Sequence, residues 1–88
     1  MRFIAGGDTV GDMNSVGAAV RHLRKLRKIK QTELARRMGM SQGHVSDLER
    51  GDVTWTETTI RAAATALGVS AGALIDIADT VAQSGQAA

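Results

Sequence analysis

Two short helical patterns stand next to each other near the middle of the chain, at residues 31–38 and 42–50. In each pattern the apolar residues recur at the spacing that places them on one side of a helix. Only residues 39–41 separate the two patterns, so two helices there must cross at a short turn and bury their apolar sides together. The positions that we expect to be buried are Leu34, Ala35, Met38, Val45 and Leu48.

The residues around the turn suit this geometry. Gly39 fits the left-handed conformation that ends a helix, and Ser41 is a favourable N-cap for the helix that follows. The small side chain of Ala35 permits close contact between the helices, and Val45 packs the second helix against the first. Counted from Gln31, these positions have the spacing of a helix-turn-helix motif.

Apolar periodicity predicts three further helices, at residues 15–28, 57–67 and 71–82. Thr56 and Ser70 are the expected N-caps of the last two. A chain of 88 residues that is 43% hydrophobic is large enough for one modest core. We therefore predict an all-α fold, a compact bundle of five helices that contains the helix-turn-helix.

The predicted domain spans residues 15–82. Residues 1–14 contain glycines and no sustained period, so we expect a flexible N-terminal arm. Residues 83–88 are expected to form a disordered tail. The initial segment MRFIAGG is too short for a signal peptide, and no apolar run approaches the ~20 residues of a membrane span. We expect a cytoplasmic protein with no membrane partner.

Composition argues against several classes of function. The chain has no Cys, and His22 and His44 have no companions at metal-ligand spacing, so no metal site is expected. The sequence also contains no evident nucleophile beside a base, no carboxylate pair suited to acid and base catalysis, and no phosphate-binding glycine loop at a helix start. We predict that the protein is not an enzyme and needs no cofactor.

The positive charge is concentrated in one region. Residues 15–37 contain eight basic residues and the single acid Glu33, which makes +7, whereas the whole chain carries only +2. Such a concentration favours a polyanionic partner, and nucleic acid is the leading candidate. The alternative is a solvated helix face. Part of the basic patch on helix 15–28 is expected to lie too far from a nucleic acid to contribute directly.

Two segments carry a family resemblance, QTELARRMGMSQGHVSDLERG at residues 31–51 and TIRAAATALGVSAGAL at residues 59–74. They resemble the lambda-repressor-like, Cro-type helix-turn-helix family, also called the xenobiotic response element family. The similarity covers about residues 15–78. The joint pattern of Q-x-x-L-A, G-x-S, V-S-x-L-E-x-G and A-L-G-V-S is specific, although each piece alone is weak. The resemblance implies a DNA-binding protein.

The helix at residues 42–50 is the expected recognition helix. Its geometry places Gly43, Ser46, Asp47 and Arg50 nearly opposite the buried side, and Gln42 at the N-terminal tip that enters the major groove. The resemblance implies base contacts by Gln42, Gly43 and Asp47, and we add Ser46 from its position. Gln42 is suited to pair with adenine N6 and N7.

Other residues are expected to contact the DNA backbone. The resemblance implies that Gln31 and His44 contact phosphates or nearby bases, and helix-start amides near Ser41 and Gln31 are placed to bind a phosphate oxygen. The loop GDVTWTE lacks the basic residues that relatives often carry, which transfers phosphate contacts to neighbouring helices. The complete predicted phosphate set is Lys30, Gln31, Arg36, Arg37, Ser41, His44 and Arg50.

Two residues of the recognition helix depart from the family pattern. Gly43 replaces a larger polar residue, so it offers close backbone approach or room for a thymine methyl and no side-chain bond. Asp47 is an acid on a surface expected to meet DNA. It either accepts a bond from a cytosine N4 amino group or pairs with Arg50 or Arg37, and we expect the pairing, because an unpaired carboxylate beside phosphates is costly.

Two positions are expected to be structural. Arg24 and Glu49 match a family ion pair that braces the first helix against the third, so we assign them to structure. Trp55 replaces the proline typical of its loop. We expect Trp55 to cover the edge of the core, with contact to the DNA backbone or to a partner as the alternative.

We therefore predict a sequence-specific transcription regulator that binds double-stranded operator DNA as a homodimer. The expected dimer interface is on the fifth helix and consists of Ile75, Ala71 and Ala82, with Phe3 and Ile4 of the arm as possible additions. Two other functions fit the same residues. One is an antitoxin that also binds a toxin protein, and the other is a protein-interaction module that has lost DNA binding.

Overall fold

The computed structural model describes residues 6–87, and its side chains over residues 15–82. This part of the chain is entirely helical apart from its turns and loops, which confirms the predicted all-α fold. The five helices are α1 (Gly6–Leu26), α2 (Gln31–Met38), α3 (Gln42–Arg50), α4 (Glu57–Leu67) and α5 (Ala71–Ala87).

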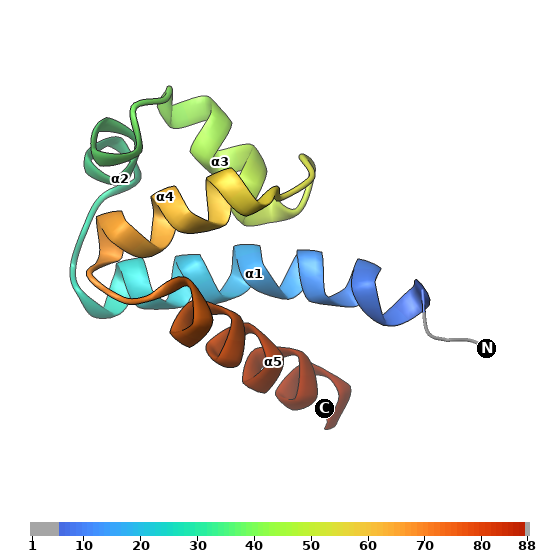
Figure 1. The fold of residues 1–88 in the computed structure, drawn as a ribbon. Helices are drawn as coiled ribbons and strands as arrows, with labels where there is room; N and C mark the ends of the chain where they lie inside the picture. The colour runs from blue at the N-terminus through green and yellow to red at the C-terminus, as the bar shows by residue number, and fades with distance from the viewer. Residues whose placement is uncertain (1–5, 88) are drawn as a thin grey trace.

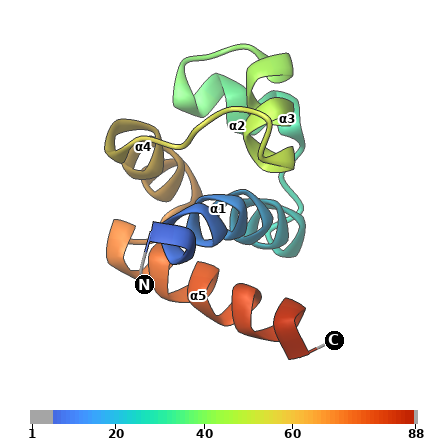
Figure 2. The ribbon, with the colours of Figure 1, turned by 90° about the vertical axis from the view of Figure 1, so that its right-hand side faces the viewer.

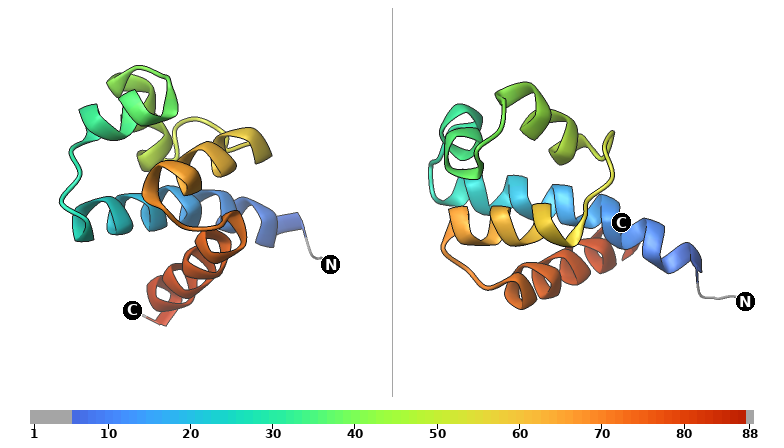
Figure 3. Two further views of the ribbon diagram at one scale, coloured as in Figure 1. Left: turned by 60° about the vertical axis from the view of Figure 1, so that its left-hand side comes forward. Right: turned by 45° about the horizontal axis from the view of Figure 1, so that its top comes forward.

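The helix α1 runs through the middle of the molecule (Figure 1). The helix α5 packs along one side of it, and α3 and α4 contact its other side (Figures 1 and 2). Both views of Figure 3 show α3 on the side of α1 away from α5. The helix α3 thus packs on α1 and keeps one of its faces free.

One apolar core joins all five helices. Its buried side chains are mostly Leu, Val and Ala. Trp55 lies at the edge of this core, with 2% of its surface exposed. The indole Nε1 of Trp55 donates a hydrogen bond to the Leu48 carbonyl oxygen at 3.0 Å, so its polar atom is satisfied. This burial confirms that Trp55 covers the core. The largest fully buried side chains are Val20, Leu34, Val45, Leu48, Leu67 and Leu74.

The predicted helix boundaries in the centre of the chain are confirmed. Ser41 accepts a hydrogen bond from the His44 amide at 3.2 Å, and Thr56 forms a reciprocal capping box with Thr59. Gly39 has a φ of 72°, the left-handed conformation that the short turn requires. The capping residues and the glycine that the sequence predicts for this region therefore occupy the expected positions in the structure.

The turn after α1 contains a residue with a positive φ that sequence reasoning did not single out. Lys28 has a φ of 58° and is the only non-glycine residue with a positive φ in the described part of the chain. The amide of Ile29 donates to the Arg24 carbonyl oxygen at 2.9 Å, so the chain closes α1 with a glycine-type turn built on lysine.

The structure differs from the sequence prediction at both ends. The helix α1 begins at Gly6, within the segment expected to be a flexible arm, and ends at Leu26 instead of residue 28. The helix α5 continues to Ala87, beyond the predicted end at residue 82. Once a helix is nucleated, adding a residue costs little, so a helix extends into segments that are weak helix formers. Residues 1–5, and with them Phe3 and Ile4, lie outside the described residues.

None of the described helices is by itself long and apolar enough to cross a membrane. The pair α4 and α5 reaches the required length and composition only together, and the two helices meet at an angle of 97°.

Candidate nucleic-acid interface

The helix α3 presents one side to the core and one side to solvent. Val45 and Leu48 are buried, whereas Gly43 and Arg50 are exposed and Asp47 is partly exposed. This confirms the orientation expected from helix geometry. The N-terminal tip, with Gln42, is exposed as well.

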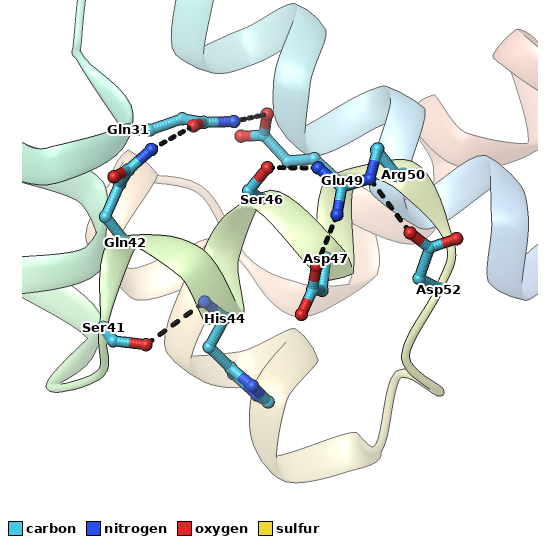
Figure 4. Close-up of polar contacts among 9 residues, drawn as sticks. All are labelled: Gln31, Ser41, Gln42, His44, Ser46, Asp47, Glu49, Arg50 and Asp52. Atoms are coloured by element: carbon cyan, nitrogen blue, oxygen red, sulfur yellow. Dashed lines mark hydrogen bonds and ion pairs between the residues drawn. The ribbon is translucent and has the colours of Figure 1, made fainter.

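A chain of hydrogen bonds runs from the core to this tip (Figure 4). Gln42 Nε2 donates to Gln31 Oε1 at 2.9 Å, and Gln31 Nε2 donates to Glu49 Oε1 at 2.9 Å. Gln31, which the sequence assigned to phosphate contacts, is thus the residue that orients the side chain of Gln42. With its amide nitrogen held in this way, Gln42 keeps its amide oxygen and its second N–H available at the tip of α3.

Glu49 is in turn held by Arg24. Arg24 Nε donates to Glu49 Oε2 at 2.7 Å and Arg24 Nη2 to Glu49 Oε1 at 3.2 Å, a bidentate pair. The third nitrogen, Nη1, donates to the Ile29 carbonyl oxygen at 2.9 Å. The side chains are 11% and 3% exposed. The structure thus brings together the two residues predicted to brace α1 against α3.

Arg50 is the centre of a second cluster on α3 (Figure 4). Its Nη2 donates to Asp47 Oδ1 at 2.5 Å, its Nε to Asp52 Oδ2 at 2.9 Å and its Nη1 to Ser46 Oγ at 2.6 Å. The hydrogen bond to Asp52, more than the charge of Asp47, raises the pKa of Arg50. Asp47 is therefore paired, as expected, and Arg50 is occupied by two carboxylates instead of being free for a phosphate.

Two of the predicted phosphate contacts share one acid on α2. Glu33 forms ion pairs with Arg36 and, at 2.9 Å, with Arg37. These two hydrogen-bonded arginines lower the pKa of Glu33 to about 2. Arg37 Nη1 also donates to the Ala66 carbonyl oxygen at 3.0 Å, which ties α2 to the end of α4. The pair of arginines therefore carries a net charge near +1 after Glu33 is counted.

The remaining predicted DNA-contacting residues are accessible. Lys30 is exposed at the N-cap of α2 and has no acidic partner among the described residues. Ser41 is exposed while its hydroxyl caps α3, and His44 is partly exposed one turn along. No Cβ at Gly43 would meet another atom within 4 Å, so the surface there is open.

Sequence reasoning missed two of these contacts. The Arg50 to Asp52 pair crosses the end of α3 into the loop, where no helical spacing indicates it. The hydrogen bond between Gln42 and Gln31 joins two helices. The only signal for it in the sequence is that each of these helices begins with a glutamine. Both depend on how the turn places the two helices.

The predicted dimer surface is partly accessible. Ile75 is 44% exposed, and Ala71 and Ala82 are partly buried on the same side of α5. No group of three or more potential metal-ligating side chains occurs among the residues that the structure describes.

The fold and the free face of α3 are those of a helix-turn-helix protein. The helix-turn-helix family profile matches residues 20–74. The chain belongs to this family, which confirms the resemblance found in the sequence.

Several known proteins are similar to the chain. The immunity repressor protein of Bacillus phage phi105 is 33% identical over 61 residues, which cover 69% of this chain and 42% of the repressor. The clp gene regulator ClgR of Corynebacterium glutamicum has a TM-score of 0.81 at 28% identity, with 86% of this chain and 81% of that chain covered. The restriction-modification controller protein C.AhdI of Aeromonas hydrophila has a TM-score of 0.67 at 30% identity, with 72% and 96% covered. The chain spans less than half the length of the curated relatives that it matches.

Proposed function

We propose that this protein is a sequence-specific transcription regulator that binds operator DNA through α3. The observation that carries the proposal is the hydrogen-bonded chain from Glu49 through Gln31 to Gln42. A side-chain amide held at the tip of an exposed helix is prepared for bidentate pairing with adenine, because its orientation is set before DNA arrives. The names of the similar proteins, a repressor and two regulators, support the same function.

In this proposal Gln42, Gly43, Ser46 and Asp47 face the bases. Gln42 supplies the main direct contact. Gly43 allows the backbone to approach, and the Asp47 carboxylate is masked by Arg50 until a base donor competes for it. This masking also weakens the case for a module that has lost DNA binding, since the acid on the reading surface is neutralised.

The test is selection of bound sequences from a random duplex pool with the wild-type protein, followed by affinity measurements on the selected site. Gln42→Ala should lose about 1–3 kcal/mol on that site and leave binding to random DNA nearly intact. Thr58→Ala, a similar truncation at an exposed position of α4, is the matched control. It should change neither the affinity for the selected site nor the affinity for random DNA. Absence of any enriched sequence, or equal losses on both DNAs, would contradict the proposal.

Phosphate contacts by Lys30, Arg36 and Arg37 are part of the proposal. Arg36→Ala combined with Arg37→Ala should flatten the dependence of affinity on salt for every DNA sequence alike, since each lost contact removes about 0.9 from the slope. A double variant with the wild-type slope would exclude these two residues from the interface.

We also propose that the protein binds its operator as a homodimer through α5, with Ile75 at the centre and Ala71 and Ala82 beside it. An exposed apolar side chain between small residues suits self-complementary packing about a two-fold axis. Sedimentation of Ile75→Glu should show monomers. The control is Leu26→Glu, because Leu26 is the other exposed large apolar side chain of the described residues, at 63%. A dimer that persists in Ile75→Glu places the interface elsewhere.

A DNA-binding role would place the protein in the compartment that holds the DNA, in agreement with the cytoplasmic location expected from the sequence. The antitoxin is the alternative function. A toxin protein that co-purifies with this protein at a fixed stoichiometry would identify it as an antitoxin.

A further inference from the structure

A polar cavity of about 240 Å³ lies between α1 and α3, beside the reading side of α3. It opens next to Gln31 at the start of α2. Its lining is almost entirely charged or hydrogen bonding, in contrast to the apolar core a few residues away. The lining residues are Arg21, Arg24, Lys25, Gln31, Ser46, Glu49 and Arg50.

The buried part of this lining is already neutral. Glu49, its only acid, is engaged by the bidentate bonds of Arg24, and the remaining Arg24 nitrogen bonds the Ile29 carbonyl oxygen. The charged groups of both residues are therefore already hydrogen-bonded within the protein. The net positive charge of the cavity comes from its other basic residues.

Arg21 and Lys25 provide that charge at the rim. They stand four residues apart on α1, so their side chains lie next to each other on one face of the helix, and both are exposed. Neither forms an ion pair with any described residue. Each of Arg24, Arg36, Arg37, Arg50 and Arg61, by contrast, has a carboxylate within ion-pair distance.

The opposite wall, on α3, adds a hydrogen-bond donor. Ser46 Oγ accepts from Arg50 Nη1 at 2.6 Å, so the hydroxyl hydrogen of Ser46 remains available to an anion. The same bond holds the Arg50 guanidinium against the cavity wall. Two cations with no ion pair among the described residues, one hydroxyl and one fixed guanidinium thus surround a space large enough to admit a small oxyanion.

We propose that this cavity binds a phosphate group, supplied by a backbone phosphodiester of the DNA strand beside the bases that α3 reads. This inference rests on the proposed function and extends it to α1, whose basic patch was expected to lie partly too far from the DNA. Arg21 and Lys25 are suited to the role because they have no carboxylate of a described residue to release before they bind, unlike Arg36, Arg37 and Arg50. A free phosphate is the other source of the same chemical group.

The first arm of the test measures affinity for one duplex at several salt concentrations. Because the cavity takes one phosphate, the Arg21→Gln, Lys25→Gln double variant should reduce the magnitude of the salt slope by about 0.9, and each single variant by part of that amount. Arg61→Gln removes one charge from α4, away from the cavity, and should leave the slope unchanged. Circular dichroism verifies that the variants keep the wild-type fold, as expected for exposed side chains.

The second arm uses inorganic phosphate at constant ionic strength, with NMR signals of the Arg21 Nε–H and the Ser46 amide as reporters. A saturable shift of both signals in the wild type, with no shift of the Ser46 amide in the Arg21→Gln, Lys25→Gln double variant, shows that free phosphate fills the site. A lowered salt slope without that shift assigns the site to the DNA backbone alone.

The inference is overturned if the double variant keeps the wild-type slope and phosphate shifts neither signal. If the wild-type protein binds no duplex DNA, the proposed function fails, and the phosphate titration still decides whether the cavity is an anion site. The two failures are therefore distinguishable.

Discussion

Gly17 of α1 lies directly against the backbone of Leu48 in α3. A Cβ atom at Gly17 would be 2.5 Å from the Leu48 carbonyl oxygen and 2.8 Å from that of Glu49, distances that side-chain adjustment does not relieve. The same Leu48 oxygen accepts the hydrogen bond from Trp55. Three parts of the chain thus meet at one carbonyl group of α3.

Gly17→Ala should lower the free energy of unfolding by about 1–3 kcal/mol, because the added methyl group pushes α3 away from α1. The measurement is chemical denaturation. Gly43→Ala is the matched control, since it is the same change within a helix but meets open space. It should be neutral or stabilise by about 0.5–1 kcal/mol through helix propensity. Equal effects of the two substitutions would show that the contact at Gly17 is unimportant.

Glu49→Ala should destabilise the fold by about 3–5 kcal/mol, because it leaves the nearly buried Arg24 without its carboxylate. Replacing both residues, with Arg24→Met and Glu49→Leu, should cost much less than the sum of the single changes. A double-mutant cycle in denaturant measures this coupling. Single losses that simply add would mean that the pair contributes no coupling energy.

Lys28→Gly should stabilise the protein by about 1 kcal/mol, since glycine takes a positive φ without the cost that a Cβ imposes. Thermal unfolding measures the change. Lys28→Ala, which removes the same charge but keeps a Cβ, should give no such increase. A comparable increase in both variants would assign the effect to charge and not to the backbone.

Glu33 should remain ionised far into the acid range. Its folded-state pKa of about 2 is below the ordinary value of 4.5, so the stabilisation by its ion pairs is complete above pH 4.5 and is lost as the pH falls through about 2. A titration of the side-chain carboxyl carbon by NMR should show a midpoint near 2. Arg36→Gln, which removes the largest cause, should raise that midpoint. A wild-type midpoint near 4.5 would mean that the pairs do not persist in solution.

Much of the fold was predictable because it depends on neighbours in the sequence. The apolar spacing of residues 31–50, the left-handed glycine at position 39 and the caps at Ser41 and Thr56 are local properties, and each appears where it was predicted. The family pattern added the partnership of Arg24 and Glu49. The helix ends were predicted less well, because propagation of a formed helix depends on packing elsewhere and not on the end residues themselves.

The sequence by itself determined which helix is exposed and which of its residues face outward, since the 3.6-residue period follows from the backbone alone. Only the tertiary structure decided what those residues contact. Gln31 orients Gln42, and Arg50 is occupied by Asp47 and Asp52, because the turn and the packing on α1 bring these side chains within hydrogen-bond distance. Arg21 and Lys25 form no ion pair for the same reason: among the residues whose side chains the structure describes, no acid of another helix lies within ion-pair distance of them. Long-range pairing depends on distances between helices, which no spacing along the chain specifies.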